Sequence, residues 1–248
     1  MSLTDFSVPR KWINAGLSLF YPEVCQICAG QRATPKEGFV CADCWRNVRF
    51  IKPPFCERCG LPYEGEITTA FECSNCREME LYFTSARSAV VAKNLVLDVI
   101  HRYKYSCALW FEPFLADLLI RAAKPVLETQ SWDFIVPVPL HPLKKREREF
   151  NQAERLAKQL SCATKISMNA SLLERVEPTR TQTELTRPQR MANVQRAFRM
   201  KNNARLNGEK IVLLDDVLTT GATTSACAKV LQKAGAGEIC VWTVARGL

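Results

Sequence analysis

The sequence lacks any long apolar run. Its longest apolar stretches, such as Phe134–Leu140 and Ile211–Leu214, are far shorter than the roughly 20 residues of a bilayer-spanning helix. The first 20 residues also lack the continuous apolar core and small-residue cleavage site of a secretory signal. We therefore expect a cytosolic, cytoplasmic protein without a transmembrane segment.

Two common nucleotide-binding loops are missing as well. There is no Gly-Lys-[Ser/Thr] Walker loop and no Gly-x-Gly-x-x-Gly dinucleotide turn. Apolar residues make up 47% of the chain and charged residues 24%, which is ordinary globular composition and excludes a disordered or collagen-like chain. A length of 248 residues suits one domain of ordinary size with a small appendage.

Cysteine is abundant and unevenly placed. Eight of the 12 cysteines form four Cys-x-x-Cys pairs, separated by 12, 11 and 13 residues: Cys25 and Cys28, Cys41 and Cys44, Cys56 and Cys59, Cys73 and Cys76. Nothing directs the chain to an oxidising compartment, so metal is favoured over disulfides, with redox thiols or a cluster as the lesser alternative. Eight thiolates predict two closed, structural Zn²⁺ sites that staple a segment too short for its own core.

The sequence does not decide which pairs share an ion. Alternate pairs would give a cross-braced module and neighbouring pairs would give two successive ribbons. We favour successive ribbons, because each then closes a short loop at modest entropic cost. The other cysteines, Cys107, Cys162, Cys227 and Cys240, have no partner at ligand spacing and are expected to be small core residues.

The net charge of +9 is concentrated in one part of the chain. Residues 144–210 hold sixteen Lys and Arg against seven acidic residues, whereas residues 25–76 hold six of each. An anion-facing surface is therefore expected within residues 144–210. Its basic run, Lys144–Arg148, suits a pyrophosphate, a nucleic-acid backbone or only water.

Apolar periodicity begins near Leu81 and alternates between strand and helix patterns. The predicted strands are Ala86–Ala92, Phe134–Leu140, Lys210–Leu214 and Glu238–Ala245; the predicted helices are Leu95–Tyr105, Leu109–Ala123, Asn151–Leu160 and Thr223–Ala234. We expect Pro125 to end the second helix. Such alternation indicates an α/β fold with a mostly parallel twisted sheet flanked by helices, whose ligands lie at the carboxyl ends of the strands. The expected organisation is an N-terminal segment (1–24), a zinc module (25–80) and an α/β domain (81–248).

The most informative stretch is Ile211–Thr223. Four apolar residues lead to adjacent carboxylates, Asp215 and Asp216, and a polar turn then opens a helix. Backbone N–H groups of a turn at a helix N-terminus, helped by threonine hydroxyls, form a phosphate cradle, and the carboxylates just before it can accept hydrogen bonds from sugar hydroxyls. The expected cradle residues are Thr219, Thr220, Gly221, Ala222 and Thr223.

All thirteen positions of this stretch resemble the phosphoribosyl-pyrophosphate (PRPP) signature of type I phosphoribosyltransferases. The resemblance implies the fold of those enzymes. It also implies that Thr219–Thr223 hold the 5′-phosphate, that Asp215 and Asp216 meet the ribose hydroxyls, and that Mg²⁺ accompanies the pyrophosphate. Thr219 stands where hypoxanthine-type members carry an aspartate base, which disfavours oxopurine transfer.

A second segment is similar to the ComF and GntX-like family of competence-related proteins. Val136-Pro-Val-Pro-Leu-His141, the run Arg148–Ala153 and the double zinc ribbon in front carry this resemblance. It implies that Arg148, Phe150, Asn151 and Gln152 form the pyrophosphate side of the site. Glu149 stands where glycine is usual, and its carboxylate would repel pyrophosphate unless it turns outward. Residues resembling the family's mobile loop are Arg180–Leu185, Arg190, Asn193, Ala197 and Phe198.

The family resemblance implies a PRPP-binding protein that handles single-stranded DNA, in natural transformation or in the use of DNA as a nutrient, with DNA-uptake proteins as partners. An active phosphoribosyltransferase on an unknown acceptor is the alternative, and a zinc-ribbon adaptor is a third reading. Only Arg246-Gly-Leu follow the last predicted strand, so an acceptor would have to be framed by the zinc module or residues 81–128. His141 is expected to be a turn residue, and Lys104 suits either the site or solvent.

Overall fold

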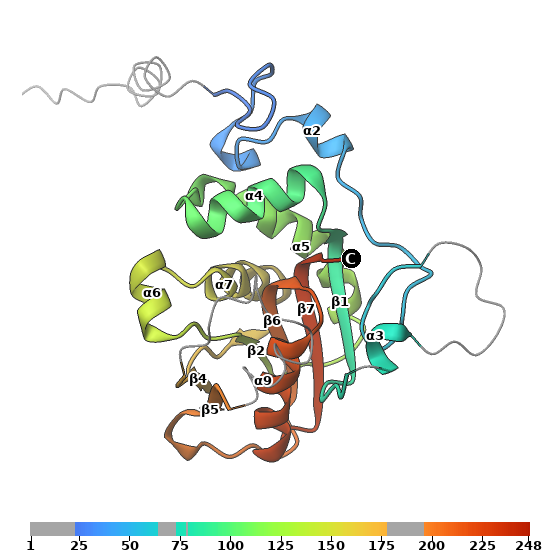
Figure 1. Ribbon diagram of the computed structural model, residues 1–248, viewed down its shortest axis with the longest axis vertical. Coiled ribbons are helices and arrows are strands. Elements are labelled where there is room, and N and C mark those ends of the chain that lie inside the picture. The colour runs from blue at the N-terminus through green and yellow to red at the C-terminus, as the bar shows by residue number, and fades with distance from the viewer. Residues whose placement is uncertain (1–22, 64–72, 78, 178–195) are drawn as a thin grey trace, which may run out of the picture.

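The computed structural model describes residues 23–63, 73–77, 79–177 and 196–248. Its centre is a five-stranded parallel sheet in the order β1-β7-β6-β2-β3 (Figure 1). The strands are β1 (Ser85–Val91), β2 (Phe134–Pro137), β3 (Ser167–Met168), β6 (Lys210–Leu218) and β7 (Glu238–Arg246). The expected α/β architecture, with a mostly parallel sheet, is confirmed.

Helices cover both faces of the sheet. One face carries α4 (Asn94–Tyr105), α5 (Glu112–Leu127), preceded by the short η2 (Leu109–Phe111), and α7 (Gln152–Thr164). The other face carries α9 (Ala222–Lys233) and a small antiparallel pair, β4 (Leu173–Arg175) and β5 (Phe198–Met200), which η4 (Lys201–Asn203) follows. Along β6, Val212 and Leu214 face the first layer while Ile211 and Leu213 face the second, as the period of two requires.

The cysteine-rich segment packs against both faces. Its first half, with η1 (Pro35–Glu37) and α2 (Ala42–Arg46), lies over α4 and α5, and its second half, with α3 (Ser74–Arg77), joins the α9 side (Figure 1). Between the halves, the Ile51 N–H donates to Ala89 O (2.9 Å) and the Val91 N–H donates to Arg49 O (3.0 Å). This connection covers the outer edge of β1, which would otherwise present unpaired backbone groups.

Three boundary predictions are wrong. The strand predicted at Lys210–Leu214 extends through the two aspartates, because β6 continues to pair with β7 as far as Leu218 opposite Arg246. Pro125 does not end α5, which runs to the buried Leu127. A proline in the last turn removes a single N–H bond, and burial of Leu127 offsets that loss. The strand predicted at Phe134–Leu140 ends earlier, at Pro137.

The prediction for the unpaired cysteines is half right. Cys227 and Cys240 are buried, but Cys107 and Cys162 are exposed. Cys107 lies in the turn after α4, with a φ of 49°. Cys162 lies two residues beyond the buried Leu160, about 200° around the helix and therefore on its outer side. Over the described residues no helix combines the length and apolarity needed to cross a membrane.

Candidate phosphate site and zinc centres

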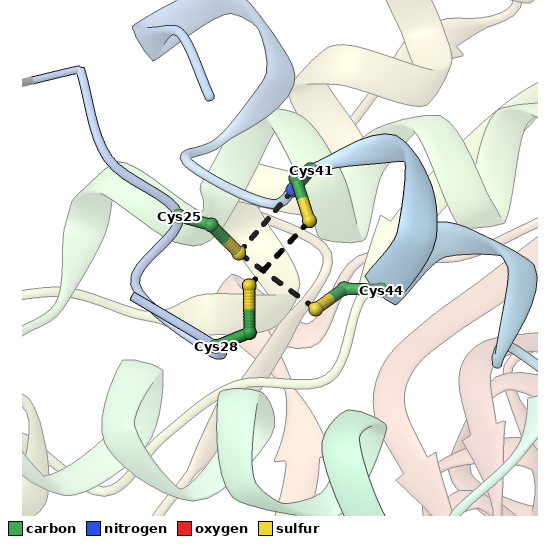
Figure 2. A group of neighbouring side chains, drawn as sticks. All are labelled: Cys25, Cys28, Cys41 and Cys44. Atoms are coloured by element: carbon green, nitrogen blue, oxygen red, sulfur yellow. Dashed lines mark hydrogen bonds between the residues drawn. The ribbon is translucent and has the colours of Figure 1, made fainter. Parts of the chain in front are cut away.

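The first four cysteines meet at one point. Cys25, Cys28, Cys41 and Cys44 lie with their sulfur atoms all within 4.8 Å of one another. The Sγ atoms of Cys25 and Cys44 are 3.7 Å apart, as are those of Cys28 and Cys41 (Figure 2). A tetrahedron with zinc–sulfur bonds of about 2.3 Å has edges of about 3.8 Å, so these side chains fit a closed zinc site.

The second group has the same geometry. Cys56, Cys59, Cys73 and Cys76 also lie within 4.8 Å of one another. The Sγ–Sγ distances are 3.7 Å for Cys56 and Cys76 and 3.6 Å for Cys59 and Cys73. Neighbouring pairs therefore share a site, which confirms the prediction of two successive ribbons and two four-cysteine sites that fit structural Zn²⁺.

Backbone N–H groups favour the thiolate form of one cysteine in each site. The Cys41 N–H donates to the Cys25 sulfur (3.4 Å), and the Cys59 N–H donates to the Cys56 sulfur (3.5 Å). Burial raises the pKa of Cys25, but N–H groups of Cys28, Cys41 and Ile27 outweigh it and hold that pKa at about 6. The balance is the same at Cys56, whose pKa is about 7. At these two cysteines the low pKa favours the deprotonated form that binds metal.

The predicted phosphate loop joins β6 to α9. Gly221 caps the helix with a φ of 90°, a conformation that glycine adopts without strain. The Thr220 Oγ1 accepts a hydrogen bond from the Ala222 N–H (3.3 Å), and the Thr224 hydroxyl donates to Gly221 O (3.1 Å). The helix N-terminus and this turn face a cavity of about 430 Å³. Its position between the carboxyl ends of β6 and β2 is the switch point of the sheet, where connections leave in opposite directions.

The cavity collects all of the predicted PRPP-binding residues except one. Those lining it are Asp215, Asp216, Thr219, Thr220, Gly221, Ala222, Thr223, Arg148, Asn151 and Gln152. Phe150 does not line it. Its ring is buried against Tyr103, with ring centroids 5.3 Å apart, so it supports the wall from behind.

The two carboxylates of β6 share one cation. Lys104 Nζ lies 2.8 Å from Asp216 Oδ2, so Lys104 faces the site. Burial and the charge of Asp216 raise the pKa of Asp215 to about 7, against the opposing charge of Lys104. Burial alone would lower the pKa of Lys104, but the charge of Asp216 and its hydrogen bond raise it. Lys104 is therefore a fixed cation beside a carboxyl that titrates near neutrality.

The opposite wall begins at α7. Asn151 caps this helix: its Oδ1 accepts from the Ala153 N–H (3.1 Å), and its Nδ2 donates to Val138 O (3.1 Å). Gln152 is 2% exposed, and its Nε2 has no hydrogen-bond partner among the described residues. Because buried donors are normally paired, this amide beside the cavity is a ready contact for a ligand oxygen.

Glu149 occupies a left-handed position, with a φ of 65° at the end of α6 (Pro142–Arg148). That conformation explains why glycine suits the position. Glu149 is exposed and does not line the cavity, so its carboxylate is turned away from the predicted pyrophosphate wall. His141 caps α6, with its Nδ1 accepting from the Leu143 N–H (3.3 Å), which agrees with a turn role.

Several residues that line the cavity belong to no recognised sequence motif. Lys144 and Arg175 add positive charge to the wall, and burial together with the charges of Arg175 and Arg148 lowers the pKa of Lys144. Arg175 comes from β4, a strand that sequence periodicity did not reveal. From α4, the cavity rim gains Leu97, Ile100, His101 and Tyr105. Of the predicted mobile-loop residues, Ala197 and Phe198 are buried around β5, and residues 180–193 lie outside the described part of the chain.

Comparison with known proteins gives matches along nearly the whole chain. A family model described as a double zinc ribbon domain matches residues 16–78. Competence protein F of Haemophilus influenzae is 31% identical over 236 residues, covering 92% of this chain and 98% of that protein. The DNA utilization protein YhgH of Salmonella typhimurium is 29% identical over 233 residues, covering 93% of this chain and 100% of that protein. An adenine phosphoribosyltransferase structure from Leishmania tarentolae aligns at 16% identity with a TM-score of 0.34, over 56% of this chain and 58% of that chain.

Proposed function

The chain belongs to the ComF family of competence-related proteins, and from this premise we propose that it binds a phosphoribosyl ligand of the PRPP type and handles single-stranded DNA in the cytoplasm. The relatives named for competence and DNA utilization support the DNA part of this role. The observation that carries the ligand part is the cavity of about 430 Å³ lined by both the phosphate loop and its adjacent carboxylates.

Each wall of the cavity suits one part of the ligand. The N-terminus of α9 and the threonine hydroxyls take the 5′-phosphate. Asp215 and Asp216 accept hydrogen bonds from the ribose hydroxyls, with Lys104 holding Asp216 in place at 2.8 Å. Lys144, Arg148 and Gln152 face the pyrophosphate from the opposite wall.

Mg²⁺ suits the same cavity, because Asp215 and Asp216 supply the carboxylate oxygens that this ion prefers. It would neutralise part of the pyrophosphate charge when bound with the ligand. The protein's own contribution is to place cations and N–H groups around those oxygens.

Single-stranded DNA would approach across the same rim. The rim carries the exposed Tyr105, with the Arg148 guanidinium 4.8 Å from its ring centroid, and His101, whose ring centroid is 4.6 Å from that of Tyr105. Aromatic and cationic side chains side by side can bind bases and phosphates without sequence preference. Lys144 on the cavity wall and the exposed Lys145 and Arg146 of α6 add positive charge to this surface.

A thermal-shift titration tests the ligand. PRPP with Mg²⁺ should raise the melting temperature of the wild type, because a ligand that binds only the folded state stabilises it by mass action. The Asp215→Asn, Asp216→Asn double variant should lose this response. A matched control is Asp98→Asn with Asp117→Asn, since these two carboxylates lie on exposed turns of α4 and α5 away from this cavity. A full response in the first double variant would refute the assignment, and assaying PRPP consumption with and without DNA tests for turnover.

A further inference from the structure

Arg246 is a buried cation at the end of β7. Its side chain is 1% exposed, and among the described residues no carboxylate lies within ion-pair distance of it. The groups that act on this guanidinium with opposite charge are the thiols of Cys59, Cys73 and Cys76. A buried charge needs a compensating charge nearby. Four thiolates around Zn²⁺ leave a net charge of about −2, so the second zinc site supplies one.

The same guanidinium holds the phosphate loop from behind. Arg246 Nη1 donates to Leu218 O (2.9 Å), to Gly247 O (2.7 Å) and to Thr219 O. Arg246 therefore connects the second zinc site, on one side, to the carbonyl groups of the loop on the other.

Asn75 makes a second connection. It lies between two zinc ligands, Cys73 and Cys76, and is 4% exposed. Its Nδ2 donates to Thr220 O (3.4 Å). The consecutive carbonyls of Leu218, Thr219 and Thr220 are thus all held by side chains next to the second zinc site.

The direction of these carbonyls matters for the ligand. In a planar trans peptide, the carbonyl of one residue and the N–H of the next point in opposite directions. When the carbonyls of Leu218, Thr219 and Thr220 turn back toward Arg246 and Asn75, the N–H groups of Thr219, Thr220 and Gly221 turn the other way. These three residues line the cavity, so their N–H groups are presented to a phosphate.

We infer that the second zinc site positions the phosphate loop through Arg246 and Asn75, so that zinc in this site and a phosphate-bearing ligand on the loop bind cooperatively. This inference rests on the proposed phosphoribosyl ligand. The first zinc site has no such role, since its cysteines belong to the core on the α4 and α5 side of the sheet. Arg246 and Asn75 are positioning residues and do not touch the ligand.

Coupling between two sites is reciprocal, so it has a readout in each direction. Ribose 5-phosphate, which needs no Mg²⁺, should slow the release of one of the two zinc ions to a colorimetric chelator. In Cys28→Ser, which removes a ligand of the first site, ribose 5-phosphate should still slow release of the remaining ion. In Cys76→Ser, which removes a ligand of the second site, the remaining ion should leave at a rate independent of ribose 5-phosphate.

Arg246→Lys is the variant that decides. Lysine keeps the charge but cannot reproduce the guanidinium fork, so ribose 5-phosphate should bind on the order of tenfold more weakly and no longer slow zinc release. Arg155→Lys is the control, because that guanidinium pairs with the buried Glu112 and does not line the cavity.

The outcomes separate the two proposals. If the wild type binds ribose 5-phosphate and Arg246→Lys binds it equally well with the same zinc protection, the coupling is overturned and the ligand assignment stands. If the wild type shows neither binding nor protection, both are overturned. If ribose 5-phosphate fails to slow zinc release only in Arg246→Lys and Cys76→Ser, the coupling is supported.

Discussion

Adjacent aspartates at the end of β6 differ in environment. Asp216 is paired with Lys104 at 2.8 Å, whereas Asp215 has its pKa raised to about 7 by burial and by the charge of Asp216. The ligand-free protein therefore keeps the carboxyl of Asp215 partly protonated near neutral pH. A sugar hydroxyl that donates to Asp215 favours the ionised form, so ligand binding and loss of this proton should go together.

The stability of Asp215→Asn should depend on pH in a defined way. In the wild type the folded state favours the protonated carboxyl, so its stability is greatest below the ordinary pKa of 3.8 and falls as pH rises toward about 7. Asparagine does not titrate. The stability advantage of the variant should therefore grow between about pH 4 and pH 7, by up to about 4 kcal/mol, and stay constant above that. Urea unfolding at several pH values measures it, and a constant difference across this range would contradict the raised pKa.

Gln152 predicts a conflict between stability and binding. Its buried Nε2 has no partner among the described residues, which costs the ligand-free protein stability. Gln152→Leu should therefore raise the free energy of unfolding by about 0.5 to 2 kcal/mol and at the same time reduce the thermal shift caused by PRPP. Gln159→Leu is the control, because the Gln159 amide donates to Glu112 (3.0 Å) and its loss should only destabilise. A Gln152→Leu variant that is less stable and binds normally would contradict a ligand-facing amide.

At the scale of elements, local sequence predicted the structure where the determinants are local. The Cys-x-x-Cys spacing was sufficient to predict two four-cysteine zinc sites, and the ease of closing short loops favoured their successive arrangement without deciding it. The order of strand, carboxylates, turn and helix was sufficient to bring Asp215 and Thr219–Thr223 to one cavity. The predicted end of this strand was wrong, because β6 continues to pair with β7 as far as Leu218. No local sequence pattern indicates that pairing.

Residues joined only by tertiary contacts were not predictable. Asn75 reaches Thr220 across 145 positions, and Lys104 reaches Asp216 from a different layer of the fold. Arg246 follows an apolar strand and looks like a terminal surface charge in the sequence, yet it is 1% exposed. A cation directly after a buried strand, in a chain with eight thiolates, was the available signal for this residue.

The turn between β6 and α9 provides a test at the element scale. Gly221 and Gly208 both have a φ of 90°, and a Cβ on either would meet no atom closer than 3.5 Å. Alanine at either position should cost about 1 to 2 kcal/mol of stability, because a left-handed conformation strains a side-chain-bearing residue. Only Gly221→Ala should also weaken PRPP binding, since it distorts the cradle. Chemical denaturation measures the stability of both variants, and thermal-shift titration measures their affinity for PRPP. Equal affinities in the two variants would show that the turn at Gly221 does not bind the phosphate.

On the scale of the whole molecule, the two zinc ribbons are part of the α/β unit. One set of cysteines joins the core that contains α4 and α5, and the other joins the core that contains α9. The connection between them pairs with β1 at Ala89 and Val91. Zinc bound at both sites would therefore stabilise the two opposite layers of one sheet, and the second of these layers contains the phosphate loop.

Positive charge is unevenly distributed along the chain, and this leads to a prediction for DNA binding. The positive excess lies within residues 144–210, where α6 places Lys144 on the cavity wall and leaves Lys145 and Arg146 exposed. Single-stranded DNA should bind with a log–log salt dependence that steepens by roughly 0.7 for each phosphate contact. Reversing these three residues to glutamate should weaken binding and flatten the slope by up to roughly 2.

The matched control reverses Lys36, Lys52 and Lys93, three exposed lysines on or beside the zinc module. The net charge changes equally in both triple variants, so a general effect of net charge would flatten both slopes alike. Titrating a labelled oligonucleotide at several salt concentrations compares them with the wild type. Because Lys144 also lines the cavity, PRPP should compete with DNA on the wild type and on the control variant. If reversing Lys144, Lys145 and Arg146 leaves the salt-dependence slope unchanged, DNA binds to another face of the molecule. The basic wall of the cavity would then contact only the pyrophosphate.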